Sequence, residues 1–355
     1  MSAADQVELG VAIVGAGIIG DNHARAIVAV PGLRVVALVD PSRESRAAVA
    51  ATLSELGRPP VAEFASLTDA LALPDLDLVA ICTPSGLHVS LAEQAIAAGK
   101  HVLIEKPLDV DLDRARRFAA IARAAADDGI VVSVVSQHRF DDASERVDAA
   151  VASGEFGRLT SGVASIAWWR PQSYYDSADW RGTRQLDGGG AAMNQGIHTI
   201  DLLLWYFGRP ALVSARTALL AHSGIEVEDT LAATIVFESG ALGLIHATTA
   251  AYPGVSASLA VYGSSGSAVI ENDALTFFRT SLTEGATDAG AAQPVGGPGT
   301  GHEAQYADLV AAIRDRRPPR VTVDDALLAL ATVRAMYLSA ESGETVEFER
   351  VLEGD

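Results

Sequence analysis

A glycine-rich turn near the N-terminus constrains the fold of this chain more than any other feature. The apolar run Val11–Val14 leads directly into the segment Gly15-Ala16-Gly17-Ile18-Ile19-Gly20, and a helical pattern follows. In such a strand–turn–helix unit, Gly15 allows the tight turn, Gly17 lets a phosphate approach the backbone, and Gly20 lets the helix pack on the strand. The helix N-terminus offers N–H groups and a positive dipole end to that phosphate. The pattern therefore predicts a dinucleotide-binding fold.

An acidic residue follows the next strand, where such folds bind the adenosine ribose. The apolar run Leu33–Val39 ends at Asp40, whose carboxylate would accept hydrogen bonds from ribose hydroxyls and repel a 2′-phosphate. We therefore expect NAD rather than NADP, although Arg43 lies close enough in sequence to contact a 2′-phosphate. The candidate cofactor-binding residues of this part are Gly15, Gly17, Ile18, Ile19, Gly20, Asp40 and Arg43.

Residues 1–136 alternate short apolar strands with helical patterns. Unbroken apolar strands between helices indicate a parallel sheet covered on both faces. This part is therefore predicted to be an NAD-binding Rossmann domain with a doubly wound parallel sheet. Strands are expected at Leu9–Val14, Leu33–Val39, Leu76–Ile81, His101–Ile104 and Ile130–Val135, and helices near 18–29, 43–56, 87–98 and 111–126.

After about residue 140, longer segments alternate apolar and polar residues and are joined by glycine-containing turns. This pattern predicts a large, mostly antiparallel sheet. Residues 137–355 are therefore expected to form a C-terminal α+β domain that binds substrate and mediates oligomerisation. Strands are expected at Leu159–Trp168, Leu212–Ala218, Thr230–Phe237, Leu242–Thr249, Ser258–Tyr262 and Ser267–Ile270, and helices near 302–315 and 324–340.

Helices on one face of such a sheet would leave its other face open. The alternating apolar side chains would have to be covered, and a large exposed apolar face is usually an interface. We therefore expect a homodimer or homotetramer built on the sheet. The apolar positions concerned are Leu231, Ala233, Ile235, Phe237, Leu242 and Leu244.

The composition excludes several classes of partner. A formal net charge of −19 repels nucleic-acid phosphates and anionic lipids, so neither nucleic acid nor a membrane is expected as a partner. No apolar run has the length of a membrane span, no cationic leader is visible, and Cys82 is the single cysteine, so a cytoplasmic protein is expected. With one cysteine and no His-Glu-x-x-His pattern, no metal site is predicted.

A lysine follows the strand His101–Ile104, in the segment Glu105-Lys106-Pro107. Ligands of open α/β sheets bind at the carboxyl ends of strands, and Lys106 lies there. Its ammonium would stabilise the developing alkoxide of a reacting alcohol or, with a lowered pKa, exchange the alcohol proton. The spacing alone is equally compatible with a surface lysine that ends a strand.

A histidine lies on a predicted helix after a glycine-rich segment. Asp187-Gly188-Gly189-Gly190 precedes Asn194, His198 and Asp201, whose gaps of four and three residues predict one helix face. A histidine on this face could hold or relay an alcohol proton. The pattern is equally typical of an amphipathic helix with a buried, hydrogen-bonded histidine.

Five motifs in order resemble the Gfo/Idh/MocA oxidoreductase family over nearly the whole chain. The resemblance implies an NAD(P)-dependent dehydrogenase that acts on CH–OH groups of sugars or polyols, with Lys106 and His198 as catalytic residues. The motifs are Gly15–Gly20, Cys82-Thr83-Pro84 with His88, Glu105-Lys106-Pro107, Trp180-Arg181-Gly182, and Gly188-Gly189-Gly190 leading to Asn194, Gly196, His198 and Asp201.

The resemblance also implies further site residues. Thr83 and Pro84 would flank the nicotinamide half of the cofactor, and Glu105 would help to hold its ribose. A segment that borders the nicotinamide pocket in the family matches Gln137 and Arg139 here. The cofactor-binding residues added in this way are Thr83, Pro84, His88, Glu105, Lys106 and Gln137, and the implied substrate-binding residues are Lys106, Arg139, Tyr174, Trp180, Arg181, Asn194 and His198.

One motif position departs from the family pattern. Many members have an acid where this chain has Asn194, and an asparagine cannot exchange a proton at neutral pH, so no relay through a carboxylate is expected. The aromatic residues before it suit the apolar face of a pyranose, and Arg181 suits its hydroxyls. We therefore expect oxidation of a ring secondary hydroxyl of a pyranose or glycoside, at C3, to a keto-sugar. Nucleotide sugars stay open, because Arg170, Arg181 and Arg184 would make the pocket locally positive.

Two other functions remain compatible with this sequence. An inositol dehydrogenase would use the same chemistry on a different alcohol. A non-catalytic dinucleotide-binding sensor would keep the fold, but the presence of both Lys106 and His198 argues against it. A metal-dependent alcohol dehydrogenase is disfavoured, because no metal-ligand spacing is visible.

Overall fold

The chain divides into two compact units in the computed structural model, which describes residues 8–281 and 300–354. Within the described chain, the first unit contains residues 8–137 and 300–324, and the second contains residues 138–281 and 325–354. Residues 300–324 thus pack with the first unit, whereas the sequence suggested the C-terminal domain. The reason is apolar burial, since Tyr306 and Leu309 of α9 (Thr300–Asp315) belong to the core formed around β1 (Leu9–Val14).

The first unit contains a six-stranded parallel sheet in the order β3-β2-β1-β4-β5-β6. This is the strand order of dinucleotide-binding Rossmann folds, so the predicted doubly wound sheet is confirmed. Helix α1 packs against α2 and α9, and α4 packs against α5. The remaining elements are α1 (Ile18–Ala29), β2 (Leu33–Val39), α2 (Arg43–Glu55), β3 (Ala62–Phe64), α3 (Leu67–Ala70), β4 (Leu78–Ile81), η2 (Ser85–Leu87), α4 (His88–Ala97), β5 (His101–Ile104), α5 (Leu112–Asp127) and β6 (Val132–Val134).

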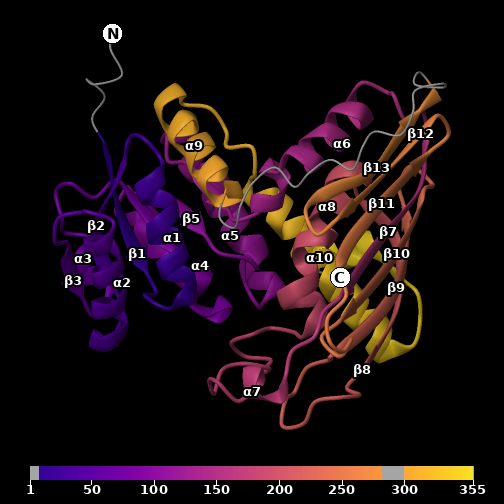
Figure 1. The fold of residues 1–355 in the computed structure, drawn as a ribbon, viewed down its shortest axis with the longest axis horizontal. Coiled ribbons are helices and arrows are strands. Elements are labelled where there is room, and N and C mark those ends of the chain that lie inside the picture. The colour runs from indigo at the N-terminus through magenta and orange to yellow at the C-terminus, as the bar shows by residue number, and fades with distance from the viewer. Residues whose placement is uncertain (1–7, 282–299, 355) are drawn as a thin grey trace. The chain divides into compact units, whose positions relative to one another are not determined.

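The second unit contains an eight-stranded sheet in the order β13-β12-β11-β7-β10-β9-β8-β14. Only β7 and β10 pair in parallel in this sheet, so the predicted mostly antiparallel sheet is also confirmed. Figure 1 shows α6, α8 and α10 on one side of these strands. The elements are η3 (Gln137–Phe140), α6 (Asp142–Ala152), β7 (Leu159–Ala167), α7 (Gln172–Tyr175), η4 (Ala191–Gly196), α8 (Ile197–Phe207), β8 (Pro210–Ala218), β9 (Thr230–Phe237), β10 (Leu242–Thr248), β11 (Ala257–Gly263), β12 (Gly266–Glu271), β13 (Ala274–Thr280), α10 (Val323–Ser342), β14 (Val346–Glu347) and α11 (Phe348–Glu353).

The two faces of the eight-stranded sheet differ in burial. The predicted apolar positions of β9 face the helices of their own unit, and the Phe237 ring stacks on Phe207 of α8. Leu242 and Leu244 of β10 lie on the opposite face, where they remain 55% and 50% exposed. The buried positions of β9 are Leu231, Ala233, Ile235 and Phe237.

The predicted helix through Asn194 begins differently from expectation. Residues Ala191–Gly196 form a π-helical turn, η4, and α8 starts only at Ile197. The wider turn changes the angular spacing between Asn194 and His198, so the α-helical spacing argument does not apply across this junction.

Among residues 8–281 and 300–354, no helix is both long enough and apolar enough to cross a membrane.

Candidate functional site

The glycine turn of the first unit shows a separate steric reason for each glycine. Gly15 has a φ of +96°, and a Cβ there would lie 2.6 Å from the Cys82 carbonyl oxygen. A Cβ on Gly20 would lie 2.1 Å from the Gly15 carbonyl oxygen, so neither position accepts a side chain. A Cβ on Gly17 would meet nothing within 4 Å, so the backbone there faces open space.

The first turn of α1 is available to an anion. Its N-cap residue, Gly17, supplies no side-chain hydrogen bond to the helix. Ile18 and Ile19 are 77% and 43% exposed, respectively. Because the first N–H groups of a helix have no intrahelical acceptors, this turn can hydrogen-bond a phosphate. The glycine turn therefore fits the pyrophosphate of a dinucleotide.

Asp40 is fixed beside the glycine turn. Its Oδ2 accepts a hydrogen bond of 2.9 Å from the Ala16 N–H, and its Oδ1 accepts one of 2.7 Å from the Ser42 N–H. Arg43 starts α2 with an exposed side chain. The carboxylate is therefore held at the carboxyl end of β2, where the ribose of a bound dinucleotide is expected.

Two of the predicted nicotinamide-side residues carry buried polar atoms that are free for a ligand. The Thr83 Oγ1 and the Gln137 Oε1 have no hydrogen-bond partner within the described chain. Buried polar atoms in proteins are nearly always hydrogen-bonded, so such atoms point to an absent partner. These residues therefore fit a bound cofactor.

His88 ties together the loops that follow two strands. It is fully buried, and its ring nitrogens lie 2.9 Å from the Thr83 carbonyl oxygen and 2.7 Å from that of Pro107. Burial lowers the His88 pKa. Pro84 directly precedes η2 in the first of these loops. This arrangement gives His88 a positioning role rather than direct contact with the cofactor.

Glu105 fixes the backbone of Lys106. The Lys106 N–H donates to Glu105 Oε2 at 3.0 Å, and Oε1 lies 2.9 Å from His23 Nε2. Burial raises the Glu105 pKa, but hydrogen bonds from His23 and His302 outweigh it and hold that pKa well below its usual range. Glu105 is therefore a buried anion with two histidine partners.

Sequence reasoning missed the residues around this carboxylate. His23 Nδ1 lies 2.6 Å from the Tyr306 hydroxyl, and His302 Nε2 lies 3.7 Å from Glu105 Oε1. His23 follows Gly20 by one helical turn, and this spacing was the one available signal. Nothing local connects α9 with β5, so His302 and Tyr306 could not have been found.

In the second unit, Arg139 is paired with acids. Its guanidinium donates to both carboxylate oxygens of Asp201, at 2.8 and 2.6 Å, and to Asp325 at 3.1 Å. The Arg139 side chain is only 5% exposed and also lies over the Trp205 ring. These contacts favour a structural role for Arg139 over the predicted contact with substrate.

His198 lies next to a second histidine of the same unit. Its ring centroid is 5.2 Å from that of His138, in an edge-on arrangement. His138 Nδ1 lies 2.7 Å from Asp141 Oδ2 and 3.1 Å from Asp273 Oδ1. Burial lowers the His138 pKa, but the two carboxylates outweigh it and raise the pKa to about 9. His198 therefore lies beside an imidazolium whose charge two carboxylates balance.

Asn194 connects the turn before His198 with the predicted sugar segment. Its Nδ2 donates to Asp187 Oδ1 at 2.8 Å and to the Gly189 carbonyl at 2.9 Å. Asp187 Oδ2 accepts the Gly182 N–H at 2.7 Å, directly after Arg181. Through Asp187, Asn194 therefore connects the turn before His198 with the backbone that follows Arg181.

Glu228, which sequence reasoning also missed, anchors the start of η4. It accepts hydrogen bonds from the N–H groups of Gly190 at 2.9 Å and Ala192 at 3.0 Å, and from the Tyr337 hydroxyl at 3.0 Å. A Cβ on Gly190 would lie 1.7 Å from the Glu228 carbonyl oxygen, which explains this glycine. Burial raises the Glu228 pKa.

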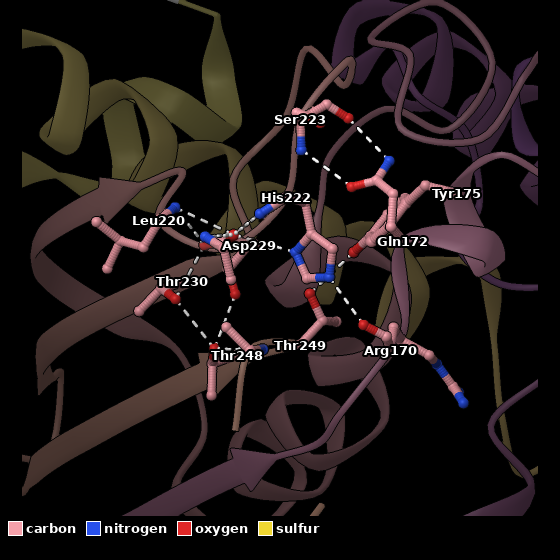
Figure 2. A network of polar contacts seen from close by, with 12 residues as sticks. Arg170, Gln172, Tyr175, Leu220, His222, Ser223, Asp229, Thr230, Thr248 and Thr249 are labelled. Carbon is pink, nitrogen blue, oxygen red and sulfur yellow. Dashed lines mark hydrogen bonds and ion pairs between the residues drawn. The ribbon is translucent and has the colours of Figure 1, made fainter. Parts of the chain in front are cut away.

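A buried network supports the segment that carries the predicted sugar-binding aromatics. Asp229 accepts the N–H groups of Leu220, Ala221 and His222, and the His222 ring bridges Asp229 and the Arg170 carbonyl at 3.1 and 2.8 Å. Figure 2 shows the Arg170 side chain extending away from this network. Further along the segment, the Arg181 guanidinium lies 4.3 Å from the centre of the Tyr174 ring and 4.6 Å from that of Trp180.

Within the part of the chain that the structure describes, two side-chain groups bring potential metal ligands within 4.8 Å of one another. They are His23–Glu105–His302 and His138–Asp141–Asp273. In the first group both histidines lie near Glu105 Oε1, at 2.9 and 3.7 Å, and in the second His138 lies 2.7 Å from Asp141 Oδ2, so ion pairs hold each group together.

Comparison with family models covers most of the chain. Residues 9–134 match the model described as "Oxidoreductase family, NAD-binding Rossmann fold", and residues 144–269 match the "GFO/IDH/MocA C-terminal domain". The first unit is thus an NAD-binding Rossmann domain.

Relatives with known names match across most of their length. The WlbA dehydrogenase of Bordetella pertussis, solved with NADH and UDP-GlcNAcA, is 32% identical with a TM-score of 0.82, and the match covers 96% of this chain and 98% of that one. The 1,5-anhydro-D-fructose reductase of Ensifer adhaerens is 28% identical over 95% of this chain and 98% of its own. The inositol 2-dehydrogenase of Rhizobium meliloti is 28% identical over 73% of this chain and 74% of its own.

The buried pair of Arg139 and Asp201 leads to a prediction about stability. Asp201→Ala should lower the free energy of unfolding by about 3–5 kcal/mol, because it leaves a buried guanidinium partly unpaired. Chemical denaturation followed by circular dichroism measures this change. The control is Glu155→Gln, which breaks the more exposed Glu155–Arg146 pair and should leave the unfolding midpoint nearly unchanged. Equal midpoints for both variants would contradict the structural role of Arg139.

Proposed function

Because the chain belongs to the Gfo/Idh/MocA oxidoreductase family, we propose that it is an NAD-dependent dehydrogenase of a pyranose sugar or glycoside. The reaction oxidises a ring secondary hydroxyl, at C3, to a keto-sugar. The first unit binds the cofactor and the second binds the sugar. The observation that carries the proposal is the open glycine turn beside the fixed Asp40 carboxylate, which suits the cofactor of such a dehydrogenase.

In this proposal, His198 and Lys106 have separate roles in the oxidation of the alcohol. Bound NAD supplies the acceptor for the hydride. His198 takes the hydroxyl proton, and the Lys106 ammonium stabilises the negative charge that develops on the oxygen. Glu105 accepts a hydrogen bond from the Lys106 N–H, so the Lys106 side chain extends from a fixed backbone position.

The named relatives support a sugar-like substrate. One was solved with a nucleotide sugar, and another is named for the reduction of an anhydro-keto-sugar. A third is named as an inositol dehydrogenase, which makes an inositol the second candidate substrate. In each case a ring carries several secondary hydroxyls, so the site must select one carbon.

We also propose that the protein is a homodimer or homotetramer assembled through the open face of the eight-stranded sheet. Leu212, Val236 and Leu242 lie side by side across β8, β9 and β10, and Leu244 lies further along the same face. Leu212, Leu242 and Leu244 are 39%, 55% and 50% exposed. An apolar patch of this kind is typical of an interface.

The fixed carboxylate of Asp40 leads to a prediction about cofactor choice. Equilibrium fluorescence titration should give tighter binding of NADH than of NADPH, because Asp40 repels a 2′-phosphate. Asp40→Asn should reduce this preference by about tenfold, the equivalent of about 1.4 kcal/mol. Arg43→Ala should weaken residual NADPH binding only. Equal or tighter binding of NADPH to the unmodified protein would refute the cofactor assignment.

The proposed roles of Lys106 and His198 lead to a prediction about turnover. Lys106→Ala and His198→Ala should each lose about a hundred- to ten-thousand-fold in kcat and retain NADH binding, as expected for proton-transfer groups. Lys100→Ala, which alters the only other lysine, is the control. The substrate is found by screening NADH formation with free sugars, glycosides, nucleotide sugars and inositols, and NMR assigns the oxidised carbon. Near-normal turnover of either variant excludes that residue from catalysis, and activity confined to inositols excludes the pyranose assignment.

The exposed sheet face leads to a prediction about assembly. Light scattering at micromolar concentration should give the mass of a dimer or tetramer, and Leu244→Lys should shift it toward the monomer because a charge would be buried in the interface. Leu56→Lys, which alters an equally apolar but unrelated surface position, should leave the mass unchanged. A monomeric unmodified protein would rule out this assembly.

A further inference from the structure

Two arginines of the second unit stack on aromatic rings in an alternating series. Arg170 Cζ lies 5.2 Å from the centre of the Trp168 ring and 5.0 Å from that of Tyr174. Arg181 Cζ lies 4.3 Å from the same Tyr174 ring and 4.6 Å from Trp180. We call these five residues the arginine–aromatic ladder. The Tyr174 ring therefore contacts two guanidinium groups.

Among the described residues, no carboxylate pairs with Arg170 or Arg181, and the Nε of each is buried without a hydrogen-bond partner. Arg184 differs, because its Nε donates to the Glu226 carbonyl and its N–H donates to the Glu226 carboxylate. Two neighbouring cations without an anion repel each other, and a bound anion would relieve this repulsion.

The backbone of the ladder is held by hydrogen bonds that do not involve the guanidinium groups. The Arg170 carbonyl is held by His222, whose other ring nitrogen lies 3.1 Å from the fully buried Asp229. The Arg170 guanidinium extends away from these contacts in Figure 2. The backbone is therefore fixed while the cationic end stays available.

Hydrogen bonds connect the ladder with the turn that precedes His198. Gln195 Nε2 donates to the Tyr174 hydroxyl at 3.4 Å, and the Gln195 Oε1 is buried without a partner within the described chain. On the other side, Asp187 joins the Gly182 N–H to Asn194. The segment that carries the two arginines is thus hydrogen-bonded to the turn that precedes His198.

We propose that Arg170 and Arg181 bind an anionic group of the sugar substrate, either a phosphate or a carboxylate. The inference rests on the proposed function and makes it more specific. A guanidinium that stacks on a ring keeps its N–H edge free, and that edge hydrogen-bonds two oxygens of a phosphate or carboxylate. Sugar nucleotides, sugar phosphates and uronic acids are then preferred over neutral glycosides.

Calorimetric titration of the NADH-loaded protein tests this site without requiring turnover. The probes are UDP, inorganic pyrophosphate, glucuronate and, as the neutral comparison, methyl glucoside. At least one anionic probe should bind, more weakly as salt increases, and more tightly than methyl glucoside. Arg170→Gln and Arg181→Gln should each weaken that binding by about tenfold or more, since each removes charge-assisted hydrogen bonds. Arg158→Gln, which removes an exposed arginine of the same unit, is the matched control and should change nothing.

The outcomes separate the two anion sources and the two proposals. Binding of UDP and pyrophosphate alone assigns the site to a phosphate, and binding of glucuronate alone assigns it to a carboxylate. Arg170→Lys and Arg181→Lys keep the charge and should weaken binding less than the glutamine variants, which distinguishes loss of charge from misfolding. Equal affinity of the Gln variants and Arg158→Gln, or no anionic probe better than methyl glucoside, overturns the inference. Failure of the Lys106 and His198 variants to lose turnover would overturn the proposed catalysis instead and leave anion binding measurable.

Discussion

Carboxylates hold the irregular backbone on which the candidate site residues of both units are built. A buried N–H group without a partner costs about 1–3 kcal/mol, and turns beside a ligand site have no neighbouring strand to supply an acceptor. Asp40 accepts the Ala16 N–H in the glycine turn, and Glu228 accepts those of Gly190 and Ala192 at the start of η4. These acids therefore determine the shape of the turns.

The sequence predicts those elements whose signals are local. The bounds of Leu33–Val39 and Thr230–Phe237 match the structure, because each is an apolar or alternating run between polar turns. The strand Val346–Glu347 could not be predicted, since two residues carry no period and only pairing with β8 defines it. The π-helical turn at Ala191–Gly196 was missed for a related reason, because its anchor Glu228 lies 36 residues from Ala192.

In the candidate site too, features with a local sequence signal could be predicted and features that depend on distant residues could not. The glycine turn was predictable because the three glycines fall within one strand–turn–helix unit, although the carbonyl that excludes a side chain at Gly15 belongs to Cys82, after β4. The pairing of the Arg139 guanidinium with acids was not predictable, because its partners Asp201 and Asp325 lie 62 and 186 residues away along the chain. The motif indicates what a guanidinium can do, whereas the tertiary structure determines whether an acid has already paired with it.

Pairing also explains how an acidic protein could keep a cationic site. With 45 acidic and 26 basic residues, the average surface repels anions, so an anionic substrate needs local cations that no carboxylate neutralises. Aromatic rings can hold a guanidinium in place by stacking and leave its charge intact. An aspartate would fix the same side chain more strongly but would cancel the charge, as Asp201 does for Arg139. The aromatic neighbours of Arg170 and Arg181 are therefore the kind of support that anion binding requires.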